Sequence, residues 1–197
     1  GYSFPWDEGD YVKKLVIEEG ITKITSHAFS GFNDLEEVIL PDGLTVIGQN
    51  AFSRCPALKS ITIPDSVTEI GIDAFWECSS LRSIDIPDSV TEIGSSAFSG
   101  CSSLQSIDIP NSVTHIGVGA FVGCYELHNI DIPNGVSDIG GYAFMSCNEL
   151  ESITIPNSVV YIGEWTFKGC YSIKVISYSG TKQEWEQIHK DKTWDIM

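Results

Sequence analysis

The stretch "SIDIPDSVTEIGSSAFSGC" at residues 83–101 decides the fold, because residues 106–124 repeat it almost unchanged as "SIDIPNSVTHIGVGAFVGC". Proline and cysteine recur along the chain with the same step of 23 residues. The two series are Pro41, Pro64, Pro87, Pro110, Pro133 and Pro156, and Cys55, Cys78, Cys101, Cys124, Cys147 and Cys170. A repeat of this length is typical of a solenoid, in which each unit forms one coil.

The first half of each unit has the pattern of a strand followed by a turn. Ile84 and Ile86 alternate with Asp85, which is the period-two pattern of a half-buried strand. Pro87 ends the strand, and the Asp or Asn that follows proline favours a turn. The next segment, SVTEIG, returns across the coil with Val and Ile inward. Its Gly94 indicates either a positive φ or a close approach of two backbones.

The second half of each unit closes the coil. Ala97, Phe98, Cys101 and Leu104 lie at helical spacing, which predicts a short helical turn. One coil alone buries too few side chains to offset the entropy of ordering its backbone. Stacked coils bury both open faces and pair their strands, so the fold depends on stacking.

The two ends depart from the repeat, as caps of a solenoid do. We divide the chain into an N-terminal cap remnant (1–11), seven 23-residue coils (12–172), and a final strand with a capping helix (173–197). The first coil has Glu18, Thr25 and Phe32 in its Pro, Gly and Cys positions. We expect Tyr2, Phe4 and Trp6 to cover the core at this end.

At the other end we expect a strand over 173–178 that opens no new coil. Thr181 and Glu184 have the spacing of a capping box, which predicts a helix from Lys182 to Lys190. Trp185, Ile188 and Trp194 are expected to cover the core there.

Charge narrows the classes of partner. The chain of 197 residues has a formal net charge of −16, which opposes binding to nucleic acid and to anionic membranes. Residues 83–167 contain ten acidic residues and no Lys or Arg, so an electrostatic partner of this segment should be cationic. The alternative is that the charge serves solubility. No apolar run approaches the length that spans a bilayer, so no membrane insertion is expected, and no signal peptide is visible at Gly1.

The repeat resembles the BspA-like leucine-rich repeat family, the 23-residue class also called the Treponema pallidum type. Its pattern L-x-x-I-x-I-P-x-x-V-x-x-I-G-x-x-A-F-x-x-C is matched by residues 81–101 at every fixed position, and the resemblance covers residues 11–178. It implies an α/β leucine-rich repeat solenoid: a right-handed coil with a parallel β-sheet on the concave face and short strands or helical turns on the others. It also implies a bacterial surface or secreted protein, several members being adhesins, and offers no catalytic residue or cofactor to carry over.

The six cysteines are expected to be free and buried. Six cysteines in a secreted chain often form disulfides, but here they occupy one core position, which Phe32 fills in the first coil. Stacked side chains point the same way rather than toward each other, which disfavours a bridge. No pair or cluster supports a zinc site.

Two groups of outward positions are candidate binding residues. Asp85, Asp108 and Asp131 share one strand position, and this column is a weak candidate for Ca²⁺ or a basic partner, the alternative being a hydrated polar face. His128 stands near them, but no nucleophile motif supports a catalytic triad. The second group is apolar and is expected to be a contact surface, a packing surface for a neighbouring domain, or surface scatter. Its members are Tyr142, Trp165, Met145 and Tyr161, with Val122, Tyr125 and Tyr171 in the same half.

From these features we predict a non-enzymatic extracellular or cell-surface scaffold, similar to an adhesin and without a cofactor. Its partner would be a protein or a glycan, such as a host matrix protein or another cell surface, with any signal or anchor outside this chain. The alternative is a spacer segment of a larger surface protein without a ligand of its own.

Overall fold

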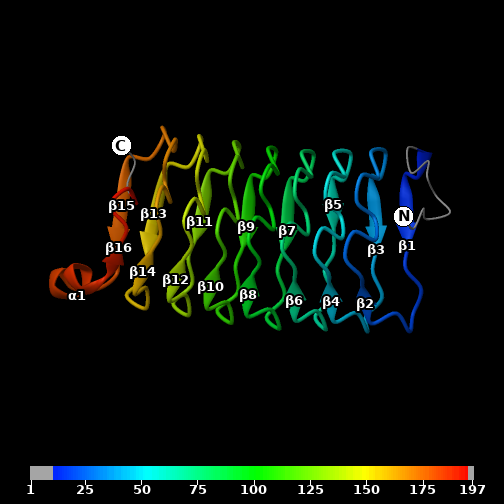
Figure 1. Cartoon of the computed structure of the whole chain (residues 1–197), viewed down its shortest axis with the longest axis horizontal. Coiled ribbons are helices and arrows are strands. Elements are labelled where there is room, and N and C mark those ends of the chain that lie inside the picture. The colour runs from blue at the N-terminus through cyan, green and yellow to red at the C-terminus, as the bar shows by residue number, and fades with distance from the viewer. Residues whose placement is uncertain (1–10, 195–197) are drawn as a thin grey trace.

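The computed structural model describes residues 11–194, which wind into an elongated stack of coils with the two ends far apart (Figure 1). Each coil contributes one odd-numbered strand from its LxxIxI segment and one even-numbered strand from its TEI segment. The odd strands are β1 (Lys14–Val16), β3 (Glu37–Ile39), β5 (Ser60–Ile61), β7 (Ser83–Asp85), β9 (Ser106–Asp108), β11 (Asn129–Asp131), β13 (Ser152–Ile155) and β15 (Val175–Tyr178). The even strands are β2 (Lys23–Ile24), β4 (Val46–Ile47), β6 (Glu69–Ile70), β8 (Glu92–Ile93), β10 (His115–Ile116), β12 (Asp138–Ile139), β14 (Tyr161–Ile162) and β16 (His189–Lys190).

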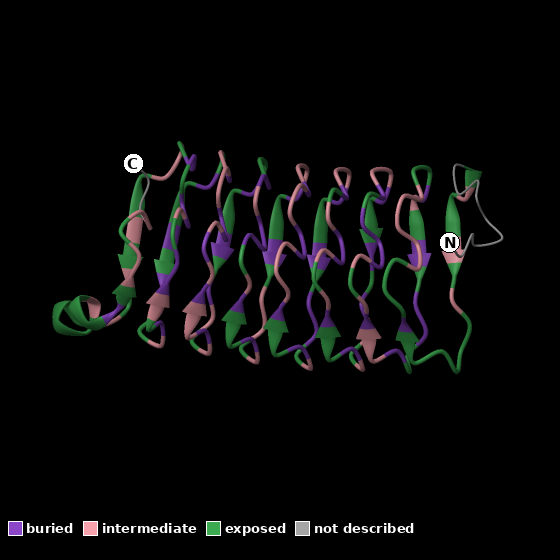
Figure 2. Ribbon diagram, in the orientation of Figure 1, coloured by how far each residue is buried: buried purple, intermediate pink, exposed green. Residues whose placement is uncertain are grey.

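Strands of neighbouring coils pair in parallel, and in every pair except β14 with β16 each residue lies beside its equivalent one repeat away. Ile84 lies opposite Ile107, for example, and Ile93 opposite Ile116. The even strands form one 8-stranded sheet, while the odd strands divide into sheets of 3, 2 and 3 strands. Figure 2 shows the alternation of buried and exposed residues along these strands that the sequence pattern predicted. The predicted leucine-rich repeat solenoid is therefore confirmed.

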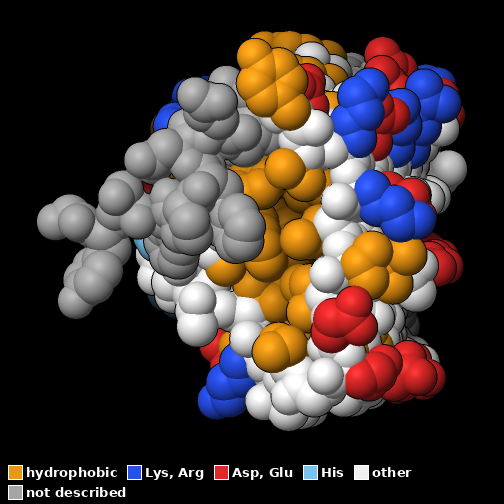
Figure 3. Space-filling view, turned by 90° about the vertical axis from the view of Figure 1, so that its right-hand side faces the viewer, with side chains coloured by type: hydrophobic (Ala, Val, Ile, Leu, Met, Phe, Trp, Pro, Cys, Tyr) orange, Lys and Arg blue, Asp and Glu red, His pale blue; other side chains and the backbone are white. Residues whose placement is uncertain are grey.

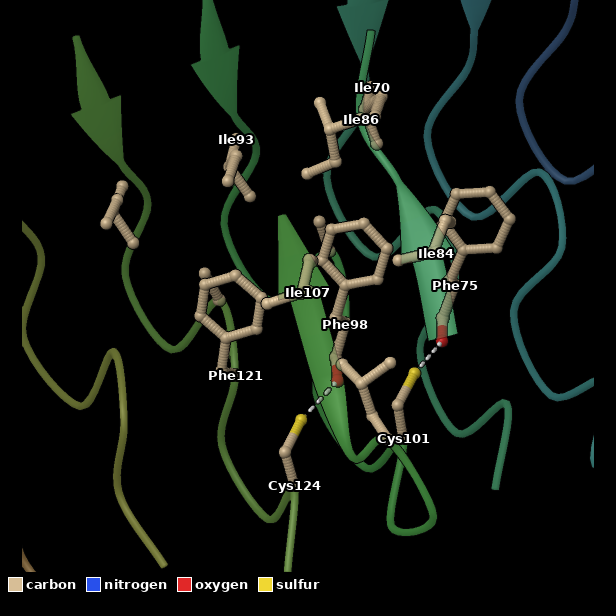
Figure 4. Close-up of a cluster of buried hydrophobic side chains, with 14 of the residues drawn as sticks. Ile70, Phe75, Ile84, Ile86, Ile93, Phe98, Cys101, Ile107, Phe121 and Cys124 are labelled. Carbon is tan, nitrogen blue, oxygen red and sulfur yellow. Dashed lines mark hydrogen bonds between the residues drawn. The ribbon is translucent and has the colours of Figure 1, made fainter. Parts of the chain in front are cut away.

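A column of phenylalanines runs through the core from coil to coil. Neighbouring ring centroids lie 5.5–5.7 Å apart, with ring planes between 2° and 17° of parallel. The members are Phe29, Phe52, Phe75, Phe98, Phe121, Phe144 and Phe167. Figure 4 shows three of these rings among the isoleucines of both sheets. Because each ring packs between two others, the apolar interior is continuous along the coil axis.

The segment that closes each coil differs from the predicted helical turn. It consists of successive turns in which an amide donates to the carbonyl three residues earlier. The Cys101 amide, for example, donates to the Phe98 carbonyl at 3.2 Å. Ser96 and Gly100 have positive φ values of 52° and 76°, and left-handed residues interrupt a right-handed helix. The equivalent positions of all seven coils are left-handed as well: His27, Asn50, Asp73, Gly119, Tyr142 and Trp165, and Gly31, Arg54, Glu77, Gly123, Ser146 and Gly169.

The left-handed residues turn this segment into a third hydrogen-bonded face. The amides of Ser96, Phe98 and Gly100 donate to carbonyls of the next coil at 2.7–2.9 Å. Amides between them bond within their own turn. Coils are thus joined through backbone hydrogen bonds on three sides, and the buried backbone groups of the turn have partners.

The glycine column marks a close approach of backbones. Gly94 has no positive φ, but a Cβ atom on it would lie 2.8 Å from the carbonyl carbon of Gly71 in the preceding coil. Of the two explanations that the sequence left open, close approach is therefore the right one. Thr25 is accommodated in this position of the first coil because no preceding coil faces it among the described residues.

The C-terminal segment opens a further, incomplete coil, which the sequence did not predict. The capping box of Thr181 and Glu184 is present, but helix α1 ends at Gln187 instead of Lys190. Ile188 is extended, and β16 then pairs with β14. An edge strand of the even sheet gains a partner in this way, which overrides continuation of the helix.

Aromatic and aliphatic side chains cover the C-terminal end of the core. Trp194 packs edge-on against Phe167 at 6.4 Å and against Trp185 at 5.5 Å, and Ile188 is buried. No residue of α1 itself is buried, so these side chains cover the core rather than the helix as a whole. Figure 3 shows hydrophobic side chains in the centre of the N-terminal end. The predicted cap residues Tyr2, Phe4 and Trp6 lie outside the described residues.

We expect Gly94→Ala to lower the free energy of unfolding by about 1–3 kcal/mol, because the added methyl group meets backbone that cannot move aside. Gly43→Ala is the matched control, since a Cβ atom there meets nothing within 4 Å. It should change stability by less than about 0.5 kcal/mol. Urea unfolding of both variants checks this, and equal losses would contradict the close approach.

Candidate interaction surfaces

The predicted binding residues lie on three different faces of the solenoid and do not form one site. Asp85, Asp108 and Asp131 lie on the odd strands, with His128 just before β11. Tyr161 lies on β14 of the even sheet. Tyr142, Met145 and Trp165 lie on the third face, which we call the turn face and define as residues 95–103 with their equivalents in each coil, here 118–126, 141–149 and 164–172.

The aspartate column is exposed but divided. Asp85 pairs in register with Asp108, whereas Asp131 pairs with Thr154 of the following coil, because β9 and β11 belong to different sheets. Within residues 11–194, no group of three or more His, Cys, Asp or Glu side chains has the arrangement to hold a metal ion. Calcium binding at this column stays a prediction. His128 is exposed, and its side chain makes no hydrogen bond or ion pair in this range.

Tyr161 belongs to the packing of the last coil. Its hydroxyl donates to a carboxylate oxygen of Asp191 at 2.9 Å, and its ring stacks on His189 at 5.6 Å. The Asp191 carboxylate raises the pKa of the Tyr161 hydroxyl, because it stabilises the protonated form. These contacts hold the C-terminal segment against the preceding coil. The Tyr161 side chain is therefore used for packing within the chain rather than for binding a partner protein.

Tyr142 and Trp165 are half-buried on the turn face and have partners of their own. The Tyr142 hydroxyl donates to Glu164 at 2.9 Å, which raises the pKa of that hydroxyl. The Lys168 ammonium lies 3.8 Å from the centroid of the Trp165 ring. Both aromatic residues have left-handed backbones, with φ of 60° and 54°. Both rings are therefore partly occupied by contacts within the chain, and Met145 is also half-buried.

The most exposed apolar side chains of this face are others, which the sequence pattern had placed second to Tyr142 and Trp165. Tyr171 is 84% exposed, Val118 53% and Tyr125 50%. The ring of Tyr125 lies over Gly123, 3.7 Å from where a Cβ atom of that glycine would be. Gly123 was the available signal for Tyr125, because a position without a side chain leaves its neighbour uncovered.

We call the apolar residues of coils five to seven on this face the turn-face patch. Its members are Val118, Val122, Tyr125, Tyr142, Met145, Trp165 and Tyr171. Clusters of exposed aromatic and aliphatic side chains are typical of contact surfaces, whereas single ones are not.

Charges are compensated at the N-terminal half of the molecule. Lys13 and Lys59 both contact Glu36, and their ammonium groups lower the pKa of its carboxyl. Lys14 pairs with Glu37 at 3.0 Å, and Arg54 with Glu77 at 3.1 Å. The middle of the chain has no Lys or Arg to make such pairs, so the two halves present different electrostatic surfaces.

The cysteines form a buried column of free thiols among the described residues. The Cys101 thiol donates to the Phe75 carbonyl at 3.2 Å and the Cys124 thiol to the Phe98 carbonyl at 3.3 Å (Figure 4). Burial raises the pKa of Cys101 to about 12, because a thiolate would lose its hydration there. A thiol of this kind is a poor nucleophile and serves packing between coils.

Comparison with known proteins agrees with this architecture. The family pattern described as "BspA type Leucine rich repeat region" matches residues 6–126 and 69–189 with 6 copies. The chain therefore belongs to the BspA-type leucine-rich repeat family. No curated protein matches the chain significantly.

Solved structures with the same fold come from several bacteria. A leucine-rich repeat protein of T. pallidum is 31% identical over 93% of this chain and 87% of its own, with a TM-score of 0.78. A leucine-rich cell surface protein of Faecalibacterium prausnitzii is 31% identical, with a TM-score of 0.67. The match covers 95% of this chain but only 65% of the F. prausnitzii protein. A leucine-rich repeat protein of Bacteroides ovatus, also 31% identical, has a TM-score of 0.51 and is covered over 55% of its length.

The thiol column leads to a labelling prediction. All six thiols should resist dithionitrobenzoate in the native protein at about pH 8, because each is buried and hydrogen-bonded. Unfolding in urea should expose all six together. Rapid labelling of the native protein at Cys101 or Cys124, or fewer than six thiols after unfolding, would contradict this arrangement.

Proposed function

We propose that the chain is a non-enzymatic scaffold that binds a partner protein through the turn-face patch. One observation carries the proposal. The fixed positions of the repeat form the buried core, so that only variable outward positions are free to recognise a partner. Apolar residues gather on the turn face of three consecutive coils, where Val118, Tyr125 and Tyr171 are exposed and the other members are half-buried. Aromatic residues and Met are enriched where proteins contact each other, which fits this composition.

The family supports the same class of function. Leucine-rich repeat proteins present side chains on a rigid, repetitive frame, and the F. prausnitzii relative is described as a cell surface protein. We extend this to placement outside the cell or on its surface, with adhesion to a host matrix protein or to another cell as the role. No helix within residues 11–194 has the length and apolar character needed to cross a membrane.

A spacer without a ligand is the second candidate. Outward positions of residues 83–110 are mostly small and polar, as a spacer requires, with Ser83, Ser106 and Gln105 as examples. Residues 118–171 depart from that pattern through Val118, Tyr125 and Tyr171, whose exposure has no use in a spacer. The patch therefore favours a binding function.

The test is an array of purified matrix proteins and glycans probed with the chain and with its double variant Tyr125→Ser, Tyr171→Ser. We expect the variant to lose at least about tenfold in affinity for a bound protein, since truncated aromatic anchors each cost about 1–2 kcal/mol or more. Folding should be unchanged, because both side chains are exposed.

Val16→Ser with Val160→Ser is the matched control, since these residues are exposed to 51% and 59% but lie outside the turn face. It should bind as the unmodified chain does. Absence of any bound protein, or equal loss in both variants, would contradict the proposal. Binding to glycans alone would replace the protein partner with a carbohydrate.

A further inference from the structure

We propose that the turn-face patch recognises a cationic segment of its partner protein, whose Lys or Arg side chains lie against Glu126 and Glu149 and over the rings of Tyr125 and Tyr171. This inference rests on the proposed function, because it names the chemistry of the partner at the same surface. It follows from three features of the turn face: uncompensated carboxylates, open aromatic rings, and a comparable group elsewhere in the chain that already holds a cation.

The carboxylates beside the patch lack counter-ions. Glu126 accepts a hydrogen bond from the side-chain amide of Gln105 at 3.1 Å, and Glu164 accepts one from Tyr142. Glu149 has no side-chain partner, and none of these three carboxylates forms an ion pair within residues 11–194. Within residues 118–126, 141–149 and 164–172, the one Lys or Arg is Lys168, which lies over Trp165.

The backbone places carboxylates and rings side by side. The Glu149 amide donates to the Tyr125 carbonyl at 3.2 Å, so Glu149 lies directly beside Tyr125 in the next coil. Tyr171 occupies the same position as Tyr125 two coils further on, about 10 Å along the axis if each coil advances by about 4.8 Å. Glu149 thus lies on the coil between two exposed rings. Ammonium and guanidinium groups bind both to carboxylates and to ring faces, so this group suits Lys or Arg.

The N-terminal half of the turn face contains the same combination with its cation present. The Arg54 guanidinium lies 4.5 Å from the centroid of the Trp76 ring, and its Nε donates to Glu77 at 3.1 Å. Ring, carboxylate and cation all come from this face. The C-terminal half of the turn face also has aromatic rings and carboxylates. Within residues 11–194, however, no Lys or Arg pairs with Tyr125, Tyr171 or Glu149, so a partner has to provide the cation.

The experiment selects short random peptides displayed on phage against the immobilised chain and measures the affinities of the selected peptides. We expect enrichment of Lys or Arg together with aliphatic or aromatic residues. Affinity should fall roughly twofold to thirtyfold in Glu126→Gln, Glu149→Gln, because each exposed ion pair contributes modestly. It should also fall as salt rises from about 0.05 M to about 0.5 M.

Glu69→Gln with Glu92→Gln is the control, since it removes the same charge from exposed residues of the even sheet. Equal weakening by both pairs would show attraction to overall charge and would overturn the inference. Peptides without Lys or Arg that still require Tyr125 and Tyr171 would overturn the cationic partner but leave the proposed function standing. If no selected peptide depends on Tyr125 and Tyr171, both proposals fail.

Discussion

The structure depends on hydrogen bonding between equivalent residues of neighbouring coils. Neighbouring coils are joined through the even strands and the turn face, and most of them also through paired odd strands. Between the seven full coils, all of these contacts require the same advance of 23 residues. This common register explains why so many positions are fixed. Gly94 allows the backbones to approach, Phe98 continues the ring stack, and the Cys101 thiol donates to a carbonyl of the preceding coil. A change in one position disturbs contacts on both sides, because every coil except the end ones has two neighbours.

Much of the fold could be predicted from the sequence, because strands and core leave periodic signals. Ile84 and Ile86 identify a strand by alternation, and the capping box of Thr181 and Glu184 correctly placed the start of α1. The left-handed backbones left no uniform signal, since Ser96, Tyr142 and Trp165 share no chemistry that favours positive φ, although Gly, Asn and Asp at several equivalent positions do favour it. The strand at His189–Lys190 was missed because the need of β14 for a partner is a property of the assembled sheet, absent from the local sequence.

The candidate site was harder to predict than the fold. Position in the same half of the chain grouped Tyr161 with the other aromatic residues, but only the contact with Asp191 reveals its role in packing. Tyr125 and Tyr171 gained importance once their exposure was known, and Glu149 once its position beside Tyr125 was known. Because the buried positions stabilise the fold, the outward positions can vary in sequence. The two halves of the turn face can therefore differ, with an internal cation on Trp76 and Glu77 in one half and none on Tyr125, Tyr171 and Glu149 in the other.

Removal of one whole coil tests the central claim most directly, because stacking in register predicts that whole repeats are dispensable and fractions are not. Deleting residues 93–115 rejoins Glu92 to Ile116 and restores the repeat, whereas deleting residues 93–104 breaks the register. The account predicts that the first variant folds cooperatively, with a urea m-value lower by roughly one-eighth, and that the second loses its cooperative transition. Unfolding of the first variant, or equal stability of both, would contradict an architecture held together by coil-to-coil register.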